Sequence, residues 1–330
     1  MTEAVAVLGA GSWGTALAIQ LARGGLQVKL WGHEPDHIER LIQQRENTDY
    51  LPGFRLADNI EPLASLADAV RQVPWLLIAI PSKGFRGLLQ QLKPLLERDT
   101  VLFWASKGFE IESGELLHEV FEQELPGHRY GVISGPTFAT EVARGMPAAI
   151  ACAGSDAEAT ETFAEMLHGD RLRVYTTDDI VGVELGGALK NVLAIAVGAS
   201  DGLGFGANTR AALMTRGLSE IMQLGTRLGA RRETLMGLAG LGDIILTCTD
   251  DQSRNRRFGL AIGQGKSVSQ AEIDVGQTVE GLRATRAIYE KTRKLDLDLP
   301  IIEAVYQVLY QSKDPRQAVR DLESRPQGRE

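Results

Sequence analysis

The first half of the chain alternates short apolar runs with turns rich in glycine and polar residues. Residues 75–80 (WLLIAI) and 101–105 (VLFWA) are apolar at every position, as expected for strands of a parallel sheet covered on both faces. Further strands are predicted at residues 4–8, 27–31, 130–133, 148–153 and 172–175. The pattern predicts an α/β domain with a doubly wound parallel sheet.

The pattern changes after residue 176. No convincing strand follows, and apolar residues recur at helical spacing in residues 180–199, 209–229, 278–292 and 301–310. We therefore expect an all-helical second domain. The boundary is predicted at residues 176–181, which divides the chain into domains 1–180 and 181–330, with the active site between them.

A glycine motif connects the first two predicted strands. Gly9, Gly11 and Gly14 form a GxGxxG sequence directly after residues 4–8, and residues 15–23 have a helical pattern that leads to the strand 27–31. In this βαβ context the glycines let the backbone approach a pyrophosphate at the helix N-terminus. A purely structural glycine turn is the alternative. The motif predicts a Rossmann-type dinucleotide site.

The end of the second strand bears on the choice of dinucleotide. An acid there would bind the ribose 2′-hydroxyl of NAD. Here Trp31 is followed by Gly32 and His33, and Glu34 comes late. This arrangement leaves space for a 2′-phosphate, so we expect both NAD and NADP to be used.

Residues 33–37 (HEPDH) match the zinc-protease pattern HExxH. That motif requires both histidines on one face of a continuous helix. Here the motif follows a strand, and Pro35 permits a helix only from about that point onward. No metal site is therefore predicted.

Polar residues follow several strands of the predicted sheet. Lys107 comes directly after residues 101–105, and Thr137 comes shortly after residues 130–133. Ligands of open α/β sheets bind beyond the carboxyl ends of the strands, so both side chains are candidates for a binding site. A solvated surface lysine is the alternative for Lys107.

One lysine interrupts a long apolar stretch rich in glycine and alanine, residues 182–196. Helical spacing places Val183, Gly187, Lys190 and Ala194 on roughly one face. Lys190 either extends its amine to solvent or acts as a catalytic amine. The five histidines all lie between residues 33 and 168, so the helical domain offers no imidazole base. That absence favours the catalytic interpretation.

A basic segment stands out in the second half. Residues 253–257 (SRNRR) combine three arginines with a serine and an asparagine. Arginine with such donors suits the capture of a phosphate. A solvated basic turn that pairs with nearby acids is the alternative.

Composition narrows the class of protein further. The 330 residues carry a net charge of −8, which argues against a general nucleic-acid or anionic-membrane binder. Two cysteines are too few for a disulfide framework. The first residues have no signal-peptide pattern, and no apolar run approaches the ~18 residues of a membrane helix. We expect a cytoplasmic protein.

The motifs together resemble the bacterial NAD(P)-dependent glycerol-3-phosphate dehydrogenases along nearly the whole chain. They are GAGSWG (9–14), NTDYLP (47–52), SKG (106–108), SGPTFA (134–139), GVELGGALKN (182–191), GLGD (240–243), SRNRRF (253–258), VEG (279–281) and LPI (299–301). The resemblance implies interconversion of dihydroxyacetone phosphate and sn-glycerol 3-phosphate, a supply of backbones for phospholipid synthesis, and a homodimer. A related 3-hydroxyacid-type dehydrogenase and a non-catalytic nicotinamide-binding sensor are the alternatives.

The resemblance also implies roles for particular residues. It makes Lys190 the proton-transfer residue, supported by Asp243 and Lys107. The implied substrate contacts are Lys107, Gly135, Thr137, Lys190, Asp243, Ser253, Arg254 and Asn255. The implied cofactor contacts, besides the three glycines, are Ser12, Trp13, His33, Lys107, Ala139, Arg254 and Glu280.

Overall fold

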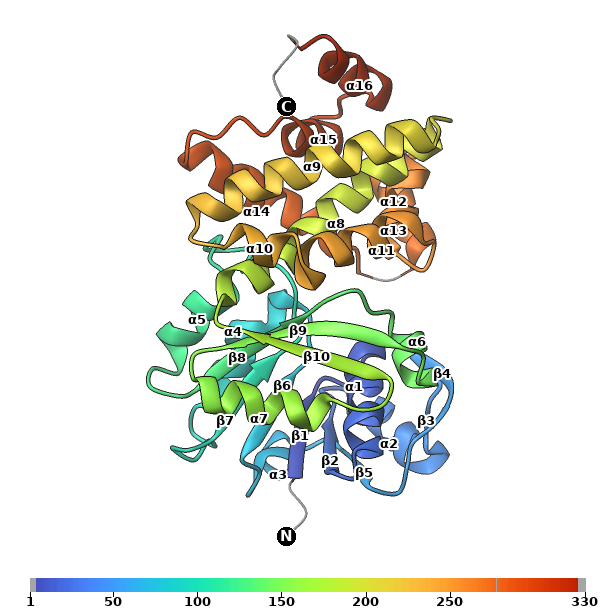
Figure 1. Ribbon diagram of the computed structural model, residues 1–330. Coiled ribbons are helices and arrows are strands. Elements are labelled where there is room, and N and C mark those ends of the chain that lie inside the picture. The colour runs from blue at the N-terminus through green and yellow to red at the C-terminus, as the bar shows by residue number, and fades with distance from the viewer. Residues whose placement is uncertain (1–3, 277, 326–330) are drawn as a thin grey trace. The chain divides into compact units, whose positions relative to one another are not determined.

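The computed structural model describes residues 4–276 and 278–325 (Figure 1). By its contacts the chain divides into two compact units. The first contains the chain up to Glu110 together with Glu115–Glu184, and the second contains Ile111–Gly114 and the chain from Leu185 onward. This division follows Glu184, whereas the sequence places the boundary at residues 180 and 181.

The first unit contains an eight-stranded sheet in the order β10-β9-β8-β7-β6-β1-β2-β5. Its strands are β1 (Ala4–Leu8), β2 (Gln27–Trp31), β5 (Ile60–Leu63), β6 (Trp75–Ile78), β7 (Val101–Trp104), β8 (Tyr130–Ser134), β9 (Ala148–Gly154) and β10 (Leu172–Thr177). A separate hairpin pairs β3 (Glu46–Asn47) with β4 (Leu51–Arg55). The predicted Rossmann-type sheet is confirmed.

Two details of this sheet differ from the prediction. The pair β8–β9 is antiparallel, so the sheet is not parallel throughout. Antiparallel neighbours need no crossover, and β9 therefore starts at the edge where β8 ends. The edge strand β5 and the β3–β4 hairpin were not predicted. The sequence of β5, IEPL, contains a proline, which is tolerated at a sheet edge but weakens the strand signal.

Helices cover both faces of the sheet. They are α1 (Ser12–Arg23), α2 (Pro35–Gln44), α3 (Leu66–Val70), α4 (Phe85–Leu92), α5 (Leu117–Glu124), α6 (Ala139–Arg144) and α7 (Ala157–Leu167), with a 3-10 turn at Ser82–Gly84. On β7, Phe103 stacks on Phe163 of α7, with ring centroids 4.0 Å apart. The next residue, Trp104, contacts Phe85 of α4 and Phe121 of α5. Successive strand residues face opposite sides, so this run is apolar because both faces are buried.

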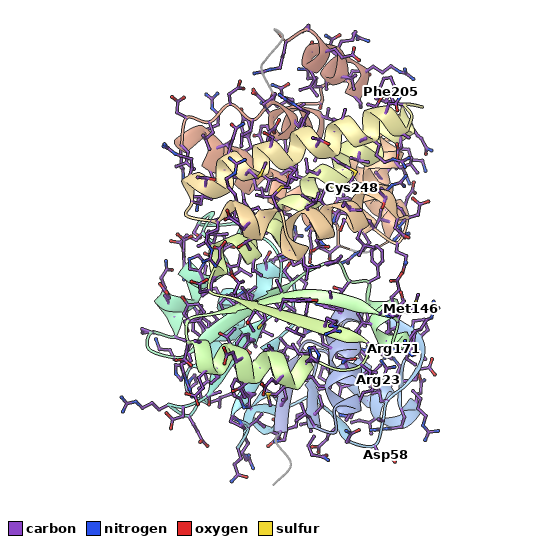
Figure 2. The ribbon with its side chains drawn as sticks, in the orientation of Figure 1. Arg23, Asp58, Met146, Arg171, Phe205 and Cys248 are labelled. Carbon is purple, nitrogen blue, oxygen red and sulfur yellow. The ribbon has the colours of Figure 1, made fainter. Side chains whose placement is uncertain are left out.

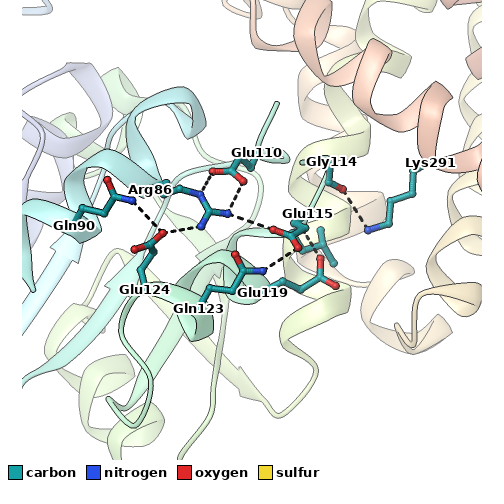
Figure 3. Close-up of polar contacts among 10 residues, drawn as sticks. Arg86, Gln90, Glu110, Gly114, Glu115, Glu119, Gln123, Glu124 and Lys291 are labelled. Carbon is teal, nitrogen blue, oxygen red and sulfur yellow. Dashed lines mark hydrogen bonds and ion pairs between the residues drawn. The ribbon is translucent and has the colours of Figure 1, made fainter. Parts of the chain in front are cut away.

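Two arginines connect helices of the first unit. Arg23, at the end of α1 and labelled in Figure 2, donates to the carbonyls of Val142 (2.9 Å) and Ala143 in α6. Arg86 of α4 is paired with three carboxylates, those of Glu110, Glu115 and Glu124 (Figure 3). The hydrogen bond from Arg86 lowers the pKa of Glu124.

The Arg86 cluster flanks the short segment that is counted with the second unit. Glu110 precedes Ile111–Gly114 and Glu115 follows it. Within the second unit, the Gly114 carbonyl accepts a hydrogen bond of 3.3 Å from Nζ of Lys291 (Figure 3). Arg86 therefore binds the residues on both sides of the segment Ile111–Gly114.

The described residues of the second unit contain helices and connecting turns but no strand, as predicted. Its elements are α8 (Ile180–Gly202, whose first turn belongs to the first unit), α9 (Ala207–Arg227), α10 (Arg232–Leu235), a π-helical turn η2 (Leu238–Gly242), α11 (Asp243–Thr249), α12 (Arg254–Gly263), α13 (Val268–Val275), α14 (Glu280–Lys294), α15 (Pro300–Tyr310) and α16 (Pro315–Glu323). Figure 1 shows α8 running behind α9.

Glycines let α8 and α12 cross backbone to backbone. A Cβ on Gly198 of α8 would lie 2.1 Å from the Arg256 carbonyl oxygen, and one on Gly263 of α12 would lie 2.1 Å from that of Ala199. Real Cβ contacts are not this short. Glycines on both helices therefore allow their backbones to lie in direct contact.

Among the described residues, α8 alone is long and apolar enough to span a membrane by length and composition. Glu184 and Lys190 still divide this helix into short apolar runs, as expected, but its valine, leucine, isoleucine and alanine residues raise its mean hydropathy. However, 83% of its most apolar window is buried within the protein, as in the core helix of a soluble protein.

Candidate active site

The glycine-rich loop lies where the strand order of the sheet reverses. β1 has β2 on one side and β6 on the other, and ligands of open α/β sheets bind at such a point. Gly9 has φ +129°, and a Cβ there would lie 2.4 Å from the carbonyl oxygen of Ala79, directly after β6. A Cβ on Gly14 would lie 1.8 Å from the Gly9 carbonyl oxygen. Both glycines are required by close backbone packing.

Gly11 is different, and it indicates that the loop fits a dinucleotide. A Cβ on Gly11 would meet nothing within 4 Å, so packing within the protein does not require glycine there. No side chain caps the N-terminus of α1 at this residue. Space beside uncapped backbone N–H groups fits a pyrophosphate. Next to it, Ser12 donates to the Tyr50 carbonyl at 2.5 Å, and Trp13 packs partly buried against the core.

His33 follows β2 on the surface. Its side chain is 79% exposed, and its Nε2 lies 3.5 Å from a carboxylate oxygen of Glu34. The end of β2 therefore carries an imidazole and a carboxylate, a combination that suits a ribose with either a 2′-hydroxyl or a 2′-phosphate. Helix α2 begins only at Pro35, and His37 is buried against Asn47, so the two histidines of the HExxH pattern do not share a helical face. In the described ranges no group of three metal-ligating side chains occurs.

The predicted residues at the ends of β7 and β8 come together. Nζ of Lys107 lies 3.5 Å from the carbonyl oxygen of Gly135, which also accepts from Oγ1 of Thr137 at 3.3 Å. A Cβ on Gly135 would lie 2.9 Å from Cα of Ile150, so the antiparallel β9 crowds this position. Ala139 begins α6 just beyond. Lys107 is held toward this turn, which argues against a freely solvated lysine.

In the second unit, Lys190 is paired with Asp243. Its Nζ donates to Oδ1 of Asp243, which also accepts from Oγ1 of Thr247 at 3.3 Å. The Lys190 side chain is 10% exposed and that of Asp243 is fully buried. The burial of the side chain and its pairing with Asp243 argue against an amine that simply extends to solvent.

Local structure explains how Asp243 reaches the lysine. The π-helical turn η2 lies directly before α11, whose first residue is Asp243. A Cβ on Gly186 of α8 would lie 2.3 Å from the carbonyl oxygen of Ala239 in this turn. The glycine therefore lets the turn contact α8 one helical turn before Lys190. A charged pair removed from water is costly unless it is well paired, so the lysine and the aspartate depend on each other.

The basic segment 253–257 divides into residues with different surroundings. Arg256 is buried and donates to Asp201 (2.7 Å), to Asp251 and to the Cys248 carbonyl (3.1 Å). Its charge is thus used within the protein. Arg254 is the first residue of α12 and is half-buried, while Arg257 is exposed. Arg254 is therefore the arginine of this segment that is best placed to bind a phosphate, because it lies at a helix N-terminus, which favours anions.

Ser253 and Asn255 also serve the local fold. Oγ of Ser253 accepts from the Arg256 backbone N–H at 3.2 Å and so caps α12. The Asn255 amide donates to Oδ1 of Asn191 (2.9 Å) and accepts from the backbone N–H of Gly281 (2.9 Å), which brings the Glu280 end of α14 to this cluster.

Asn191 is a candidate that the sequence analysis missed. Its Nδ2 is buried and has no hydrogen-bond partner among residues 4–276 and 278–325. A buried donor without a partner is costly and is typical of a position that meets a ligand or an ordered water. Its place directly after Lys190 in the helix was the available signal.

Comparisons with known proteins match this chain to one family along nearly its whole length. The family model described as NAD-dependent glycerol-3-phosphate dehydrogenase N-terminus matches residues 4–160, and the corresponding C-terminus model matches residues 179–320. The NAD(P)+ glycerol-3-phosphate dehydrogenase of Shewanella halifaxensis is 52% identical, covering 99% of this chain and 97% of its own length. That of Thioalkalivibrio sulfidiphilus is 53% identical over 98% and 97%. The crystal structure of glycerol-3-phosphate dehydrogenase from Coxiella burnetii has a TM-score of 0.95 and 44% identity, covering 98% of this chain and 99% of that one.

Proposed function

We propose a role for each site residue on one premise, that the chain belongs to the NAD-dependent glycerol-3-phosphate dehydrogenase family. The protein is an NAD(P)-dependent dehydrogenase that interconverts dihydroxyacetone phosphate and sn-glycerol 3-phosphate. The observation that carries the assignment of roles is the buried pair of Lys190 and Asp243.

Lys190 protonates the oxygen on C2 when the ketone is reduced. A bound reduced nicotinamide would supply the hydride, and negative charge would then develop on that oxygen. An ammonium group beside it stabilises the transition state more than the ground state. Asp243 holds the amine in one direction through their hydrogen bond, and Thr247 in turn holds Asp243. In the oxidation direction the same amine accepts the proton.

Arg254 binds the substrate phosphate, together with Ser253 and Asn255. A guanidinium forms charge-assisted, bidentate hydrogen bonds with phosphate oxygens. Ser253 accepts the capping bond on Oγ, which leaves its hydroxyl hydrogen to donate. Asn255 donates one amide hydrogen to Asn191, and its second amide hydrogen can donate to the phosphate.

In the first unit, Lys107, Gly135 and Thr137 contribute further substrate contacts. Their mutual hydrogen bonds gather an ammonium and a hydroxyl at one turn, and these groups suit an oxygen-rich substrate. Gly9, Gly11 and Gly14 with Ser12 and Trp13 hold the dinucleotide. His33 contacts its ribose end, while Lys107, Ala139, Arg254 and Glu280 complete its contacts.

We also propose that the chain has a domain boundary between residues 180 and 181. The protein is located in the cytoplasm, forms a homodimer and does not insert into a membrane. The buried state of α8 supports its role as a core helix. Reduction of dihydroxyacetone phosphate then supplies glycerol 3-phosphate for phospholipid synthesis.

The test follows the absorbance of NADH and of NADPH with dihydroxyacetone phosphate and, separately, with unphosphorylated dihydroxyacetone. We expect rapid oxidation of the cofactor with the phosphorylated ketone and slow oxidation with the other. Binding of cofactor without turnover of any ketone would indicate a sensor. A 3-oxo acid is assayed in the same way, and faster turnover of that acid than of dihydroxyacetone phosphate would indicate a related dehydrogenase.

A further inference from the structure

Asn47 joins the hairpin of the first unit to the glycine-rich loop. It is fully buried at the end of β3. Its Nδ2 donates to the carbonyl of Ala10 (2.9 Å) and to Oγ1 of Thr15 (2.7 Å). Its Oδ1 accepts from the backbone N–H of Tyr50 (3.2 Å) and lies 3.0 Å from Nε2 of His37. One side chain therefore connects the loop, the helix after it and the turn before β4.

The partners determine which way the amide points. The Ala10 carbonyl can only accept and the Tyr50 N–H can only donate, so Nδ2 must face the loop and Oδ1 the turn. His37 then donates from Nε2 to the same oxygen. Both amide hydrogens and both lone pairs of Oδ1 are used.

A second contact joins the same two segments. Oγ of Ser12 donates to the Tyr50 carbonyl at 2.5 Å. The hairpin thus holds the loop at Ala10 and the first turn of α1 at Ser12 and Thr15. No side chain caps α1 at Gly11, so no capping bond at that residue fixes its first backbone N–H groups. The hydrogen bonds from the hairpin, which lies outside the glycine motif, instead fix the position of these N–H groups.

We propose that Asn47 is a positioning residue for the dinucleotide. It acts through Ala10 and Thr15, and it holds the loop so that the first N–H groups of α1 face the pyrophosphate. This inference rests on the proposed function of the loop. Since precise placement of binding groups governs affinity, loss of the amide weakens cofactor binding more than it weakens the fold.

The chain offers a matched control at the other end of the same helix. Nδ2 of Asn59 donates to the carbonyls of Ala22 (2.9 Å) and Leu26 (2.8 Å), around the C-terminus of α1. Asn47→Ala and Asn59→Ala therefore each remove two donated hydrogen bonds at one end of α1. Only the first pair lies at the loop.

The experiment measures the dissociation constant of NADPH by its fluorescence, together with the melting temperature and kcat at saturating NADPH. We expect Asn47→Ala to raise the dissociation constant about tenfold or more with kcat within about twofold of wild type. Asn59→Ala lowers the melting temperature with a dissociation constant near that of wild type. Asn47→Asp keeps the shape and the acceptor for Tyr50 but loses the donors, and it serves if the alanine variant does not fold.

Two results would overturn the inference. One is a dissociation constant for Asn47→Asp equal to that of wild type. The other is an equal loss of affinity in the Asn47 and Asn59 variants, which would make Asn47 a purely structural residue. Wild-type protein that binds neither NADH nor NADPH would instead overturn the proposed function, and this inference with it.

Discussion

Lys190 on α8 and Asp243 at the start of α11 are 53 residues apart in sequence and form a hydrogen-bonded ion pair inside the helical unit. Burying two charges is rarely the most stable solution for a helical core, since apolar side chains of similar volume do as well or better. The pair is therefore best explained by the chemistry of the amine.

Replacement of Lys190 tests this explanation. Lys190→Met removes the proposed proton donor and should lower turnover of dihydroxyacetone phosphate by at least ~10³-fold, with cofactor affinity nearly unchanged. Lys190→Arg should rescue little, because guanidinium does not exchange protons near neutral pH. Lys266→Met is the control, since that lysine forms a half-exposed pair with Asp274. Retention of more than about a tenth of the turnover in Lys190→Met would refute the assignment.

Arg254→Ala should mainly weaken recognition of the phosphate. A charge-assisted contact is worth roughly 1.5–3 kcal/mol, so the ratio of kcat/KM for dihydroxyacetone phosphate to that for dihydroxyacetone should fall about 10- to 100-fold. Arg257→Ala, on the same helix but exposed, should leave the ratio unchanged. An equal loss on both substrates in Arg254→Ala would show that this residue is not the phosphate ligand.

Both NADH and NADPH should serve as cofactor. The exposed His33 and Glu34 beyond β2 neither provide a fixed acid for the 2′-hydroxyl nor exclude a 2′-phosphate. We expect kcat/KM for the two cofactors to differ by less than about 100-fold, or ~2.7 kcal/mol. A larger preference for NADH would indicate that Glu34 reaches the ribose, and Glu34→Gln should then reduce that preference.

Glu220 should make the stability of the helical unit depend on pH. Its carboxylate accepts from the backbone N–H groups of Ile301 (2.8 Å) and Ile302 (3.1 Å) at the start of α15, yet burial raises the pKa of Glu220 to about 7. The folded state therefore holds this proton more tightly than the unfolded state. Its contribution to stability is greatest below the unfolded pKa and is lost as pH rises toward 7, on the order of 3 kcal/mol.

Glu220→Gln removes that titration and keeps an acceptor for the helix. The fall in the free energy of unfolding between pH 5 and pH 8 should be smaller in this variant than in wild type. Glu303→Gln, in the first turn of α15, is the control and should follow wild type. Parallel pH profiles for wild type and Glu220→Gln would contradict the prediction.

The crossing of α8 and α12 gives a prediction of stability. Gly198→Ala places a methyl group 2.1 Å from a backbone oxygen that cannot move freely, and should cost about 1–3 kcal/mol in the free energy of unfolding. Gly87→Ala, within α4 and with open space around its Cβ, should be neutral or stabilising by up to about 1 kcal/mol. Denaturant unfolding of both variants checks the contrast, which similar losses would contradict.

Local pattern determined the elements that carry the site. The apolar runs at β1, β6 and β7, the glycine motif and the change to helical spacing after β10 are visible because backbone periodicity and glycine chemistry act within a few residues. Lys190 could be singled out for the same reason, as the lysine of an apolar helix in a region without histidine.

The partners of these residues were decided only by the tertiary structure. Which acid meets Lys190, which arginine of residues 253–257 is neutralised by Asp201, and that β9 runs antiparallel to β8 depend on segments far apart in the chain. The Asn47 amide likewise serves the glycine loop from a hairpin 37 residues away. The spacing of residues within a segment does not predict such pairings, because they form only when packing of the whole core brings the segments together.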